Sequence, residues 1–332
     1  MRLLNFFDGY SMKKIFTLQT LKDGFTIIKG AATGFGEDRA MKFSASLAYY
    51  TIFSLAPMLM LLISLAGLFL GKEAIQGQLF HEINGLIGNE AAKQVQDMLK
   101  NLEKSGQTTI SVIIGFITLV VGATSIFGEI QDSINIIWKV KAKPKRGWVK
   151  LLKDRLLSGS LIVTLGFLLV VSLIVNGALE AVSDKLKTFL PDVTVTLFSV
   201  LNVVISFVVI TILFGVIFKV LPDVKIQWKQ VRAGAIFTAL LFMLGRLLIG
   251  IYIDKTSSSS AYGPAGSLIV ILLWIYYTAA ILYFGAEFTQ AYAEFTGAKI
   301  APADYAVHVE QTETERDVDV LPPQGNVDKK ES

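Results

Sequence analysis

The sequence predicts an all-α polytopic membrane protein with six transmembrane helices, an amphipathic N-terminal helix and a small extracytoplasmic helical cap. Apolar residues make up 53% of the chain and charged residues 17%, against about 45–50% and 25% in typical soluble domains. The eighteen residues from Ser267 to Phe284 carry no charge, and a charge-free stretch of this length is typical of a bilayer-spanning helix. Such spans are helical because lipid offers no hydrogen-bond partners to an open backbone.

Six apolar segments of the sequence are long enough to cross a bilayer. They cover about residues 45–70, 110–137, 156–179, 197–221, 233–253 and 266–290. The predicted organisation is a cytoplasmic amphipathic N-terminal region at 1–44, a transmembrane domain at 45–298 and a disordered acidic cytoplasmic tail at 299–332. The first span contains Pro57, whose missing N–H predicts a helix kink at that point.

Two amphipathic segments flank the first span. Before it, Leu21, Phe25 and Ile28 recur at helical spacing, which predicts a helix lying on the membrane surface. A solvated helix packed on the cytoplasmic loops fits the same pattern. After the span, apolar residues recur every three to four positions between residues 71 and 109, which predicts two short helices that cap the outer side of the bundle.

The distribution of Lys and Arg predicts the orientation of the chain. Segments 1–44, 139–155 and 219–232 carry 19 of these residues, whereas the loops on the other side carry 7. The positive-inside rule therefore places both termini in the cytoplasm. The eight basic residues at 139–155 could also bind RNA or an anionic substrate, but the run lies between two spans, where anionic lipid already accounts for it. We expect membrane lipids as partners and no nucleic acid.

Arg246 is the fully charged side chain that lies well inside a predicted span. An Arg at the centre of a membrane helix costs roughly 2.5–3.5 kcal/mol on insertion scales, so it normally faces a partner or a wet cavity. Counting 1.5 Å per residue separates it from Glu287 by about 18 Å in depth, whereas Asn202 and Ser206 lie closer. We expect Arg246, with Asn202 and Ser206, to bind an anionic group; a structural Arg that reaches along its own helix to the interface is the alternative.

Three acids, Glu129, Asp132 and Glu287, fall near the cytoplasmic ends of the predicted helices. A gate or a proton-coupling cluster is one interpretation. The favoured alternative is that they are interfacial acids paired with Lys139, Lys141 or Arg155, because such pairs are common and weak at membrane surfaces.

The residue types argue against an enzyme. Metal-dependent RNA hydrolysis needs a cluster of His, Cys or carboxylate ligands, and this chain has no Cys and two His, His81 and His308. The charge distribution places these two on opposite sides of the membrane. A magnesium site built from Asp and Glu alone stays open, although the acids show no known spacing. The sequence also lacks a GxxxxGK[ST] phosphate-binding loop, so we expect no metal, no cofactor and no nucleotide site.

Two motifs resemble a known family. The first predicted span reads LAYYTIFSLAP, and the last reads YGPAGSLIVILLWIYY followed by GAEF. This pairing resembles the YihY / virulence factor BrkB family of bacterial inner-membrane proteins, formerly labelled ribonuclease BN, over about residues 20–298. The resemblance implies a multi-span protein of the inner (plasma) membrane, often suggested to be a transporter, with no established substrate.

The function expected from these observations is a transporter or flippase for an amphiphilic or anionic envelope component, with a lipid-like substrate favoured. A structural or envelope-assembly partner without transport activity is one alternative, and a small-solute or ion transporter is another. A homo-oligomer and an envelope protein partner are both compatible with the sequence. Ribonuclease activity has the least support, because the ligands that it needs are absent.

Overall fold

The computed structural model describes residues 18–70, 109–143, 191–257 and 265–310, with short helical pieces between residues 76 and 100. In this part of the chain the helices are α1 (Leu18–Glu37), α2 (Ala40–Leu70), α5 (Thr109–Ile137), α7 (Pro191–Val220), α8 (Trp228–Ser257) and α9 (Ala265–Phe295). Five of them overlap five predicted spans or extend them by a few residues. The span predicted at 156–179 lies outside the described residues.

Three described helices are long and apolar enough to cross a membrane: Thr196–Val220 in α7, Trp228–Ile249 in α8 and Leu268–Phe295 in α9. Together with the family relationship reported below, they make this an integral membrane protein. The number of six spans stays a prediction. The kink at Pro57 also stays a prediction. Helix α2 continues through this position, and the side chains at 56–58 lie outside the described residues.

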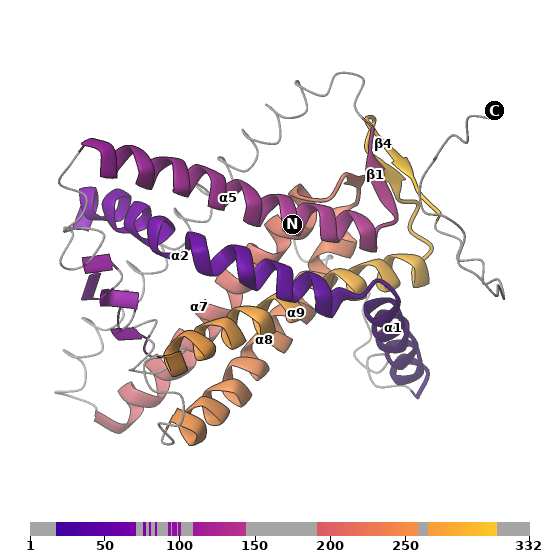
Figure 1. The fold of residues 1–332 in the computed structure, drawn as a ribbon. Helices are drawn as coiled ribbons and strands as arrows, with labels where there is room; N and C mark the ends of the chain where they lie inside the picture. The colour runs from indigo at the N-terminus through magenta and orange to yellow at the C-terminus, as the bar shows by residue number, and fades with distance from the viewer. Residues whose placement is uncertain are drawn as a thin grey trace, which may run out of the picture.

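Helix α9 lies at the centre of the bundle and packs against α1, α2, α5 and α8 (Figure 1). Its contact with α8 depends on two reciprocal pairs of small residues. A Cβ at Gly234 would collide with the side chain of Thr289, and a Cβ at Gly285 with that of Thr238. Each Thr hydroxyl donates to the carbonyl of the Gly on its own helix, so no polar group is left open where the backbones approach closely.

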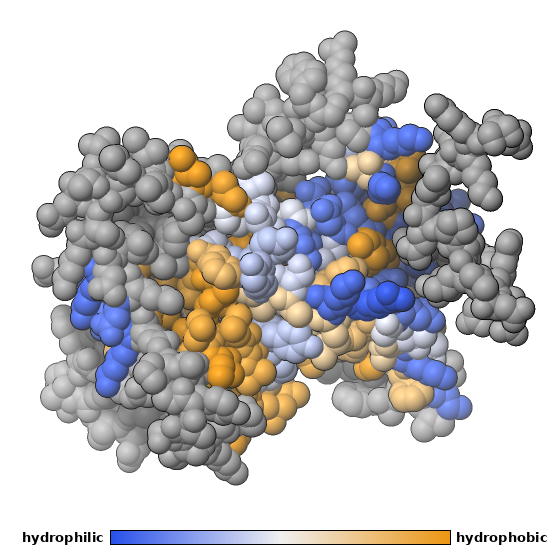
Figure 2. Space-filling model, viewed as in Figure 1, coloured by the Kyte–Doolittle hydropathy of each residue, from blue (hydrophilic) through white to orange (hydrophobic). Residues whose placement is uncertain are grey.

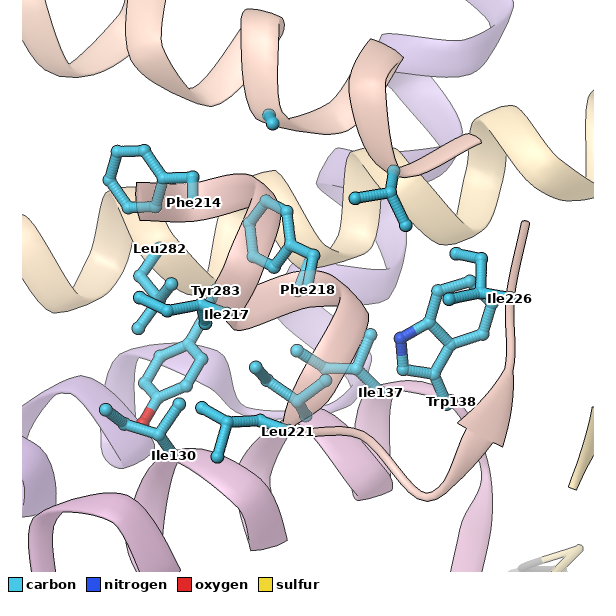
Figure 3. Close-up of a cluster of buried hydrophobic side chains, with 14 of the residues drawn as sticks. Ile130, Ile137, Trp138, Phe214, Ile217, Phe218, Leu221, Ile226, Leu282 and Tyr283 are labelled. Atoms are coloured by element: carbon cyan, nitrogen blue, oxygen red, sulfur yellow. The ribbon is translucent and has the colours of Figure 1, made fainter. Parts of the chain in front are cut away.

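The buried core lies where α5, α7 and α9 meet (Figure 3). Apolar side chains from all three helices converge there, and the set includes Ile130, Ile137, Trp138, Phe214, Phe218, Leu221, Leu282 and Tyr283. This core fixes the ends of these helices relative to one another. It therefore positions the polar end of the bundle, where α1 and the strands lie.

The expectation of a disordered tail from residue 299 is wrong for residues 301–308. Strand β3 (Ala301–Pro302) pairs with β2 (Val224–Lys225), and β4 (Ala306–His308) pairs with β1 (Val140–Ala142), both antiparallel. The tail is ordered there because its backbone hydrogen bonds to the two loops that follow α5 and α7. The rest of the predicted disordered tail, 311–332, lies outside the described residues.

The surface divides into an apolar part and a polar end. Exposed apolar side chains follow α7 and α8, among them Val200, Val204, Leu240, Leu244 and Leu248. Figure 2 shows hydrophilic residues gathered instead around α1 and the strands. Large exposed apolar faces of this kind need a lipid or protein covering.

The two predicted amphipathic segments have different outcomes. Helix α1 packs against α9 with Ile27 and Ala31 buried, while Phe25 and Ile28 are exposed. The described residues between 76 and 100 are helical, as a cap would require. Most of the segment 71–109 lies outside the described part, so the cap stays a prediction.

Candidate functional site

Glu287 is buried on α9, inside a candidate membrane span. Its carboxyl group lies against Gly34 near the end of α1, where a Cβ would collide with Glu287 Oε2. Because glycine has no side chain, α1 can approach α9 closely enough to cover the carboxyl group. The other carboxyl oxygen, Oε1, is buried and has no hydrogen-bond partner, which is costly for a polar atom.

A second carboxyl group, that of Asp38, completes the pair. Asp38 follows α1 directly, and its carboxyl group lies close enough to that of Glu287 for the two to interact. Two carboxyl groups hydrogen bond to each other only when one of them carries a proton. Burial raises the pKa of Asp38, and the nearby charge of Lys139 opposes this rise.

An open cavity of about 330 Å³ lies beside Glu287, between α1, α9 and Lys139. Its charged lining consists of Lys29 and Glu37 from α1, Glu287 and Glu294 from α9, and Lys139. Lys139 has a positive φ of 52°, a conformation that turns the chain from α5 into β1. The site is therefore a polar cavity of mixed charge that ends on a buried acid.

The sequence placed Glu287 among three acids, and the structure surrounds it with different partners. The charged groups that act on Glu287 are Asp38, Glu37 and Lys139; Glu129 and Asp132 are not among them. Glu129 is half-buried on α5, and Asp132 is exposed. Lys139 lines the same cavity as Glu287, and the pairing expected between them stays a prediction, whereas the sequence analysis did not point to Asp38. A buried acid in a span implies a partner at its own depth, which is the signal that could have pointed to Asp38.

Arg246 is exposed on α8, among the exposed apolar side chains of Leu244, Leu247 and Leu248. It makes no hydrogen bond or ion pair with the residues that the structure describes. An Arg in this position can bind an anionic group at the lipid-facing surface or extend along its helix to the interface.

Asn202 and Ser206 lie on α7 at about the depth of Arg246 on α8, but on the side of α7 that faces away from α8. Gly215 on α7 faces Ala235 on α8, because a Cβ built at the glycine would lie 3.7 Å from the Cβ of Ala235. Counting the same number of residues away from this contact along each helix places Arg246 level with Asn202 and Ser206. At about 100° per residue, these two lie about 140° and 180° around α7 from Gly215. They therefore face away from the contact with α8, and Ser206 donates to Asn202 instead.

Asp223 is a second buried acid, in the turn between α7 and β2, and its hydrogen bonds are complete. Its carboxylate accepts from Gln131 Nε2, Asn135 Nδ2 and the Tyr305 hydroxyl at 3.2, 2.9 and 2.9 Å. Its N–H donates to Asn135 Oδ1, and its carbonyl accepts from the N–H of Ala303. Asp223 thus joins α5, the loop after α7 and the tail, and the geometry assigns it to stability.

No metal centre is found among the described residues, because no three His, Cys, Asp or Glu side chains in them lie close enough together to hold an ion. His308 lies in β4, and His81 lies outside the described part. The expected absence of a metal site stays a prediction.

Residues 31–306 match the model of the family described as Virulence factor BrkB. This match covers most of the chain. The chain belongs to the BrkB family. The resemblance drawn from the first and last spans is confirmed.

The curated relatives of this BrkB-family chain are named as membrane proteins. A UPF0761 membrane protein of Stenotrophomonas maltophilia (strain R551-3) is 28% identical over 79% of this chain, and one of Vibrio vulnificus (strain YJ016) is 24% identical over 83%. The chain spans 59% of the length of the Stenotrophomonas protein and 85% of that of the Vibrio protein. No solved structure matches the chain.

Proposed function

We propose that this BrkB-family membrane protein is a transporter or flippase that moves an amphiphilic or anionic component of the bacterial envelope, with a lipid-like substrate. The observation that carries the proposal is Glu287, an ionisable group buried in a candidate span beside an open cavity. Ionisable groups in a span are costly, and they usually mark a substrate, ion or proton pathway. A bundle with a structural role alone has no need of such a group.

Arg246 supports an anionic substrate. It lies on the exposed face of α8, surrounded by apolar side chains, where a lipid phosphate could pair with its guanidinium group while the acyl chains contact the neighbouring leucines. Asn202 and Ser206, at the same depth on α7, would offer polar contacts to the same lipid layer. We propose these three residues as the substrate-contacting group.

The proposed orientation places the polar end of the bundle in the cytoplasm of a bacterium, with the protein in the inner membrane. The strands and α1 at that end adjoin the three segments richest in Lys and Arg, as the positive-inside rule requires. Both termini would then be cytoplasmic, and α2, α5 and the segment 156–179 would complete six spans.

One alternative keeps transport but changes the substrate. The cavity beside Glu287 is lined by charges of both signs, which fits a small solute or an ion better than an acyl chain. An envelope-assembly role and ribonuclease activity find no comparable support in the described residues.

The test is movement of a fluorescent anionic lipid across proteoliposomes that contain the purified full-length protein. We expect movement above that of protein-free liposomes and its reduction by at least several-fold in Arg246→Ala, with Arg246→Lys retaining part of it because the charge is kept. Lys229→Ala is the matched control, since Lys229 is an exposed cation near the start of the same helix. Equal movement in liposomes with and without protein would contradict the proposal, and uptake of small ions instead would favour the alternative.

A further inference from the structure

We propose that Asp38 and Glu287 form a proton-binding site that sets how closely α1 packs on α9, and that the proton is the coupling ion of this protein. The second part rests on the transport function proposed above; the first part does not.

The first argument is the geometry of the pair. The two carboxyl groups lie close enough to interact, and a hydrogen bond between them forms only while one proton is shared. Two carboxylates held in one place repel each other strongly, because burial reduces screening by water. Removing the proton therefore turns an attraction between Asp38 and Glu287 into a repulsion.

The second argument is access. Glu287 is only 2% exposed, yet it borders the cavity, and its Oε1 lacks a partner. The cavity volume of about 330 Å³ is enough for several water molecules at about 30 Å³ each. Protons can therefore reach the pair from the polar end of the bundle.

The third argument is the charge around the pair. Glu37 from α1 and Glu294 from α9 bring negative charge to the cavity, while Lys29 from α1 and Lys139 after α5 bring positive charge. No charged residue of α8 is among those that line the cavity. The opposing charges leave both protonation states accessible, as a coupling site requires.

The fourth argument is the mechanical link. Asp38 lies at the corner between α1 and α2, where Arg39 has a φ of 56° and the Asp38 N–H donates to the Gly34 carbonyl. Gly34 in turn lies against Glu287, and one turn earlier Gly30 lies against Ala291, 3.6 Å from a Cβ built at the glycine. Repulsion at the pair therefore acts directly on the contact between α1 and α9.

The first experiment is an infrared titration of the full-length protein in lipid nanodiscs. We expect a protonated-carboxyl C=O band at pH 7, where isolated Asp and Glu are ionised, that disappears as the pH is raised. Glu287→Gln and Asp38→Asn should both remove this band. Asp304→Asn, at an exposed acid that does not line the cavity, should leave it unchanged. A band absent at pH 7, or unaltered by both substitutions in the pair, would overturn the proposal.

The second experiment measures the distance between α1 and α9. The chain has no cysteine, so spin labels at Phe25→Cys and Phe295→Cys, two exposed positions, report on these helices alone. We expect the distance between the labels to lengthen when the pH is raised and to stay constant in Glu287→Gln, which keeps a hydrogen-bond donor at all pH values. A pH response that persists in this variant overturns the mechanical link. Asp38→Asn provides the same test if Glu287→Gln does not fold.

Coupling is tested by lipid movement in proteoliposomes with and without an imposed pH gradient. Acceleration by the gradient that Glu287→Gln abolishes supports the proton as coupling ion. Lipid movement at the same rate with and without the gradient would overturn the proton coupling but not the transport function. A titrating band without any lipid movement overturns the proposed function and leaves the proton site standing.

Discussion

Asp223 and Glu287 are both buried acids of the same bundle, and they differ in how their oxygens are satisfied. Asp223 is 1% exposed and Glu287 is 2% exposed. The carboxylate of Asp223 accepts three side-chain hydrogen bonds. Glu287 instead has one buried oxygen without a hydrogen-bond partner, an acidic neighbour and an adjacent cavity. The hydrogen bonds of Asp223 offset the free-energy cost of burying its carboxylate, whereas the burial of Glu287 remains costly.

This difference separates a stabilising acid from a functional one better than burial does. A protein gains nothing in stability by keeping a buried carboxyl group against another carboxyl group. Substitution of Glu287 is therefore expected to leave folding intact and to impair function. Substitution of Asp223 is expected to impair folding instead.

The largest effect is expected from Asp223→Ala. The substitution leaves the side-chain donors of Gln131, Asn135 and Tyr305 without their acceptor, and several unsatisfied buried groups together cost about 3–5 kcal/mol of unfolding free energy. Unfolding in mild detergent with increasing denaturant would measure this loss. Asp304→Ala, at an exposed acid of the neighbouring turn, is the control. A loss below about 1 kcal/mol would contradict the structural role.

The next effect is expected from a glycine pair on α1. In Gly34→Ala the new Cβ would collide with Glu287 Oε2, and overpacking of this kind costs about 1–3 kcal/mol. Gly36→Ala meets nothing within 4 Å and should stabilise the helix by about 0.5–1 kcal/mol. Melting temperatures of the two variants should therefore move in opposite directions. Equal shifts would show that α1 does not lie against Glu287.

A smaller effect is expected from Tyr305→Phe. The substitution removes a single 2.9 Å hydrogen bond to Asp223 and keeps the ring, so about 1–2 kcal/mol of unfolding free energy should be lost. Tyr292→Phe is the matched control, because that tyrosine stacks on Phe288. If both variants unfold alike, the tail is not held through Asp223.

The smallest effect is expected at the exposed pair of Lys225 and Asp304. The hydrogen bond and charge of Lys225 lower the pKa of Asp304 below its usual value. Stabilisation by this pair is therefore present above the ordinary pKa of an Asp and is lost as the pH falls through the lowered one. Lys225→Ala should raise the pKa of Asp304, measured by NMR, without a detectable change in melting temperature. An unchanged pKa would show that the pair does not form.

The sequence predicted the helices because their signal is local. Five of the predicted spans coincide with described helices to within a few residues, since a long apolar run determines both the environment and the hydrogen bonding of its backbone. The tail was predicted to be disordered because strands of two or three residues have no periodicity to detect. Residues 301–308 are ordered by β1 and β2, which are distant in sequence.

The sequence by itself determined the class of protein, the helix positions and the family, because composition and motifs carry that information without reference to contacts. It also singled out Glu287 as an acid near the end of a predicted span. Only the tertiary structure decided that Asp38 lies beside it, that Gly34 makes room for it, and that Arg246 is exposed. These facts depend on which helix faces meet, and packing between distant segments decides that.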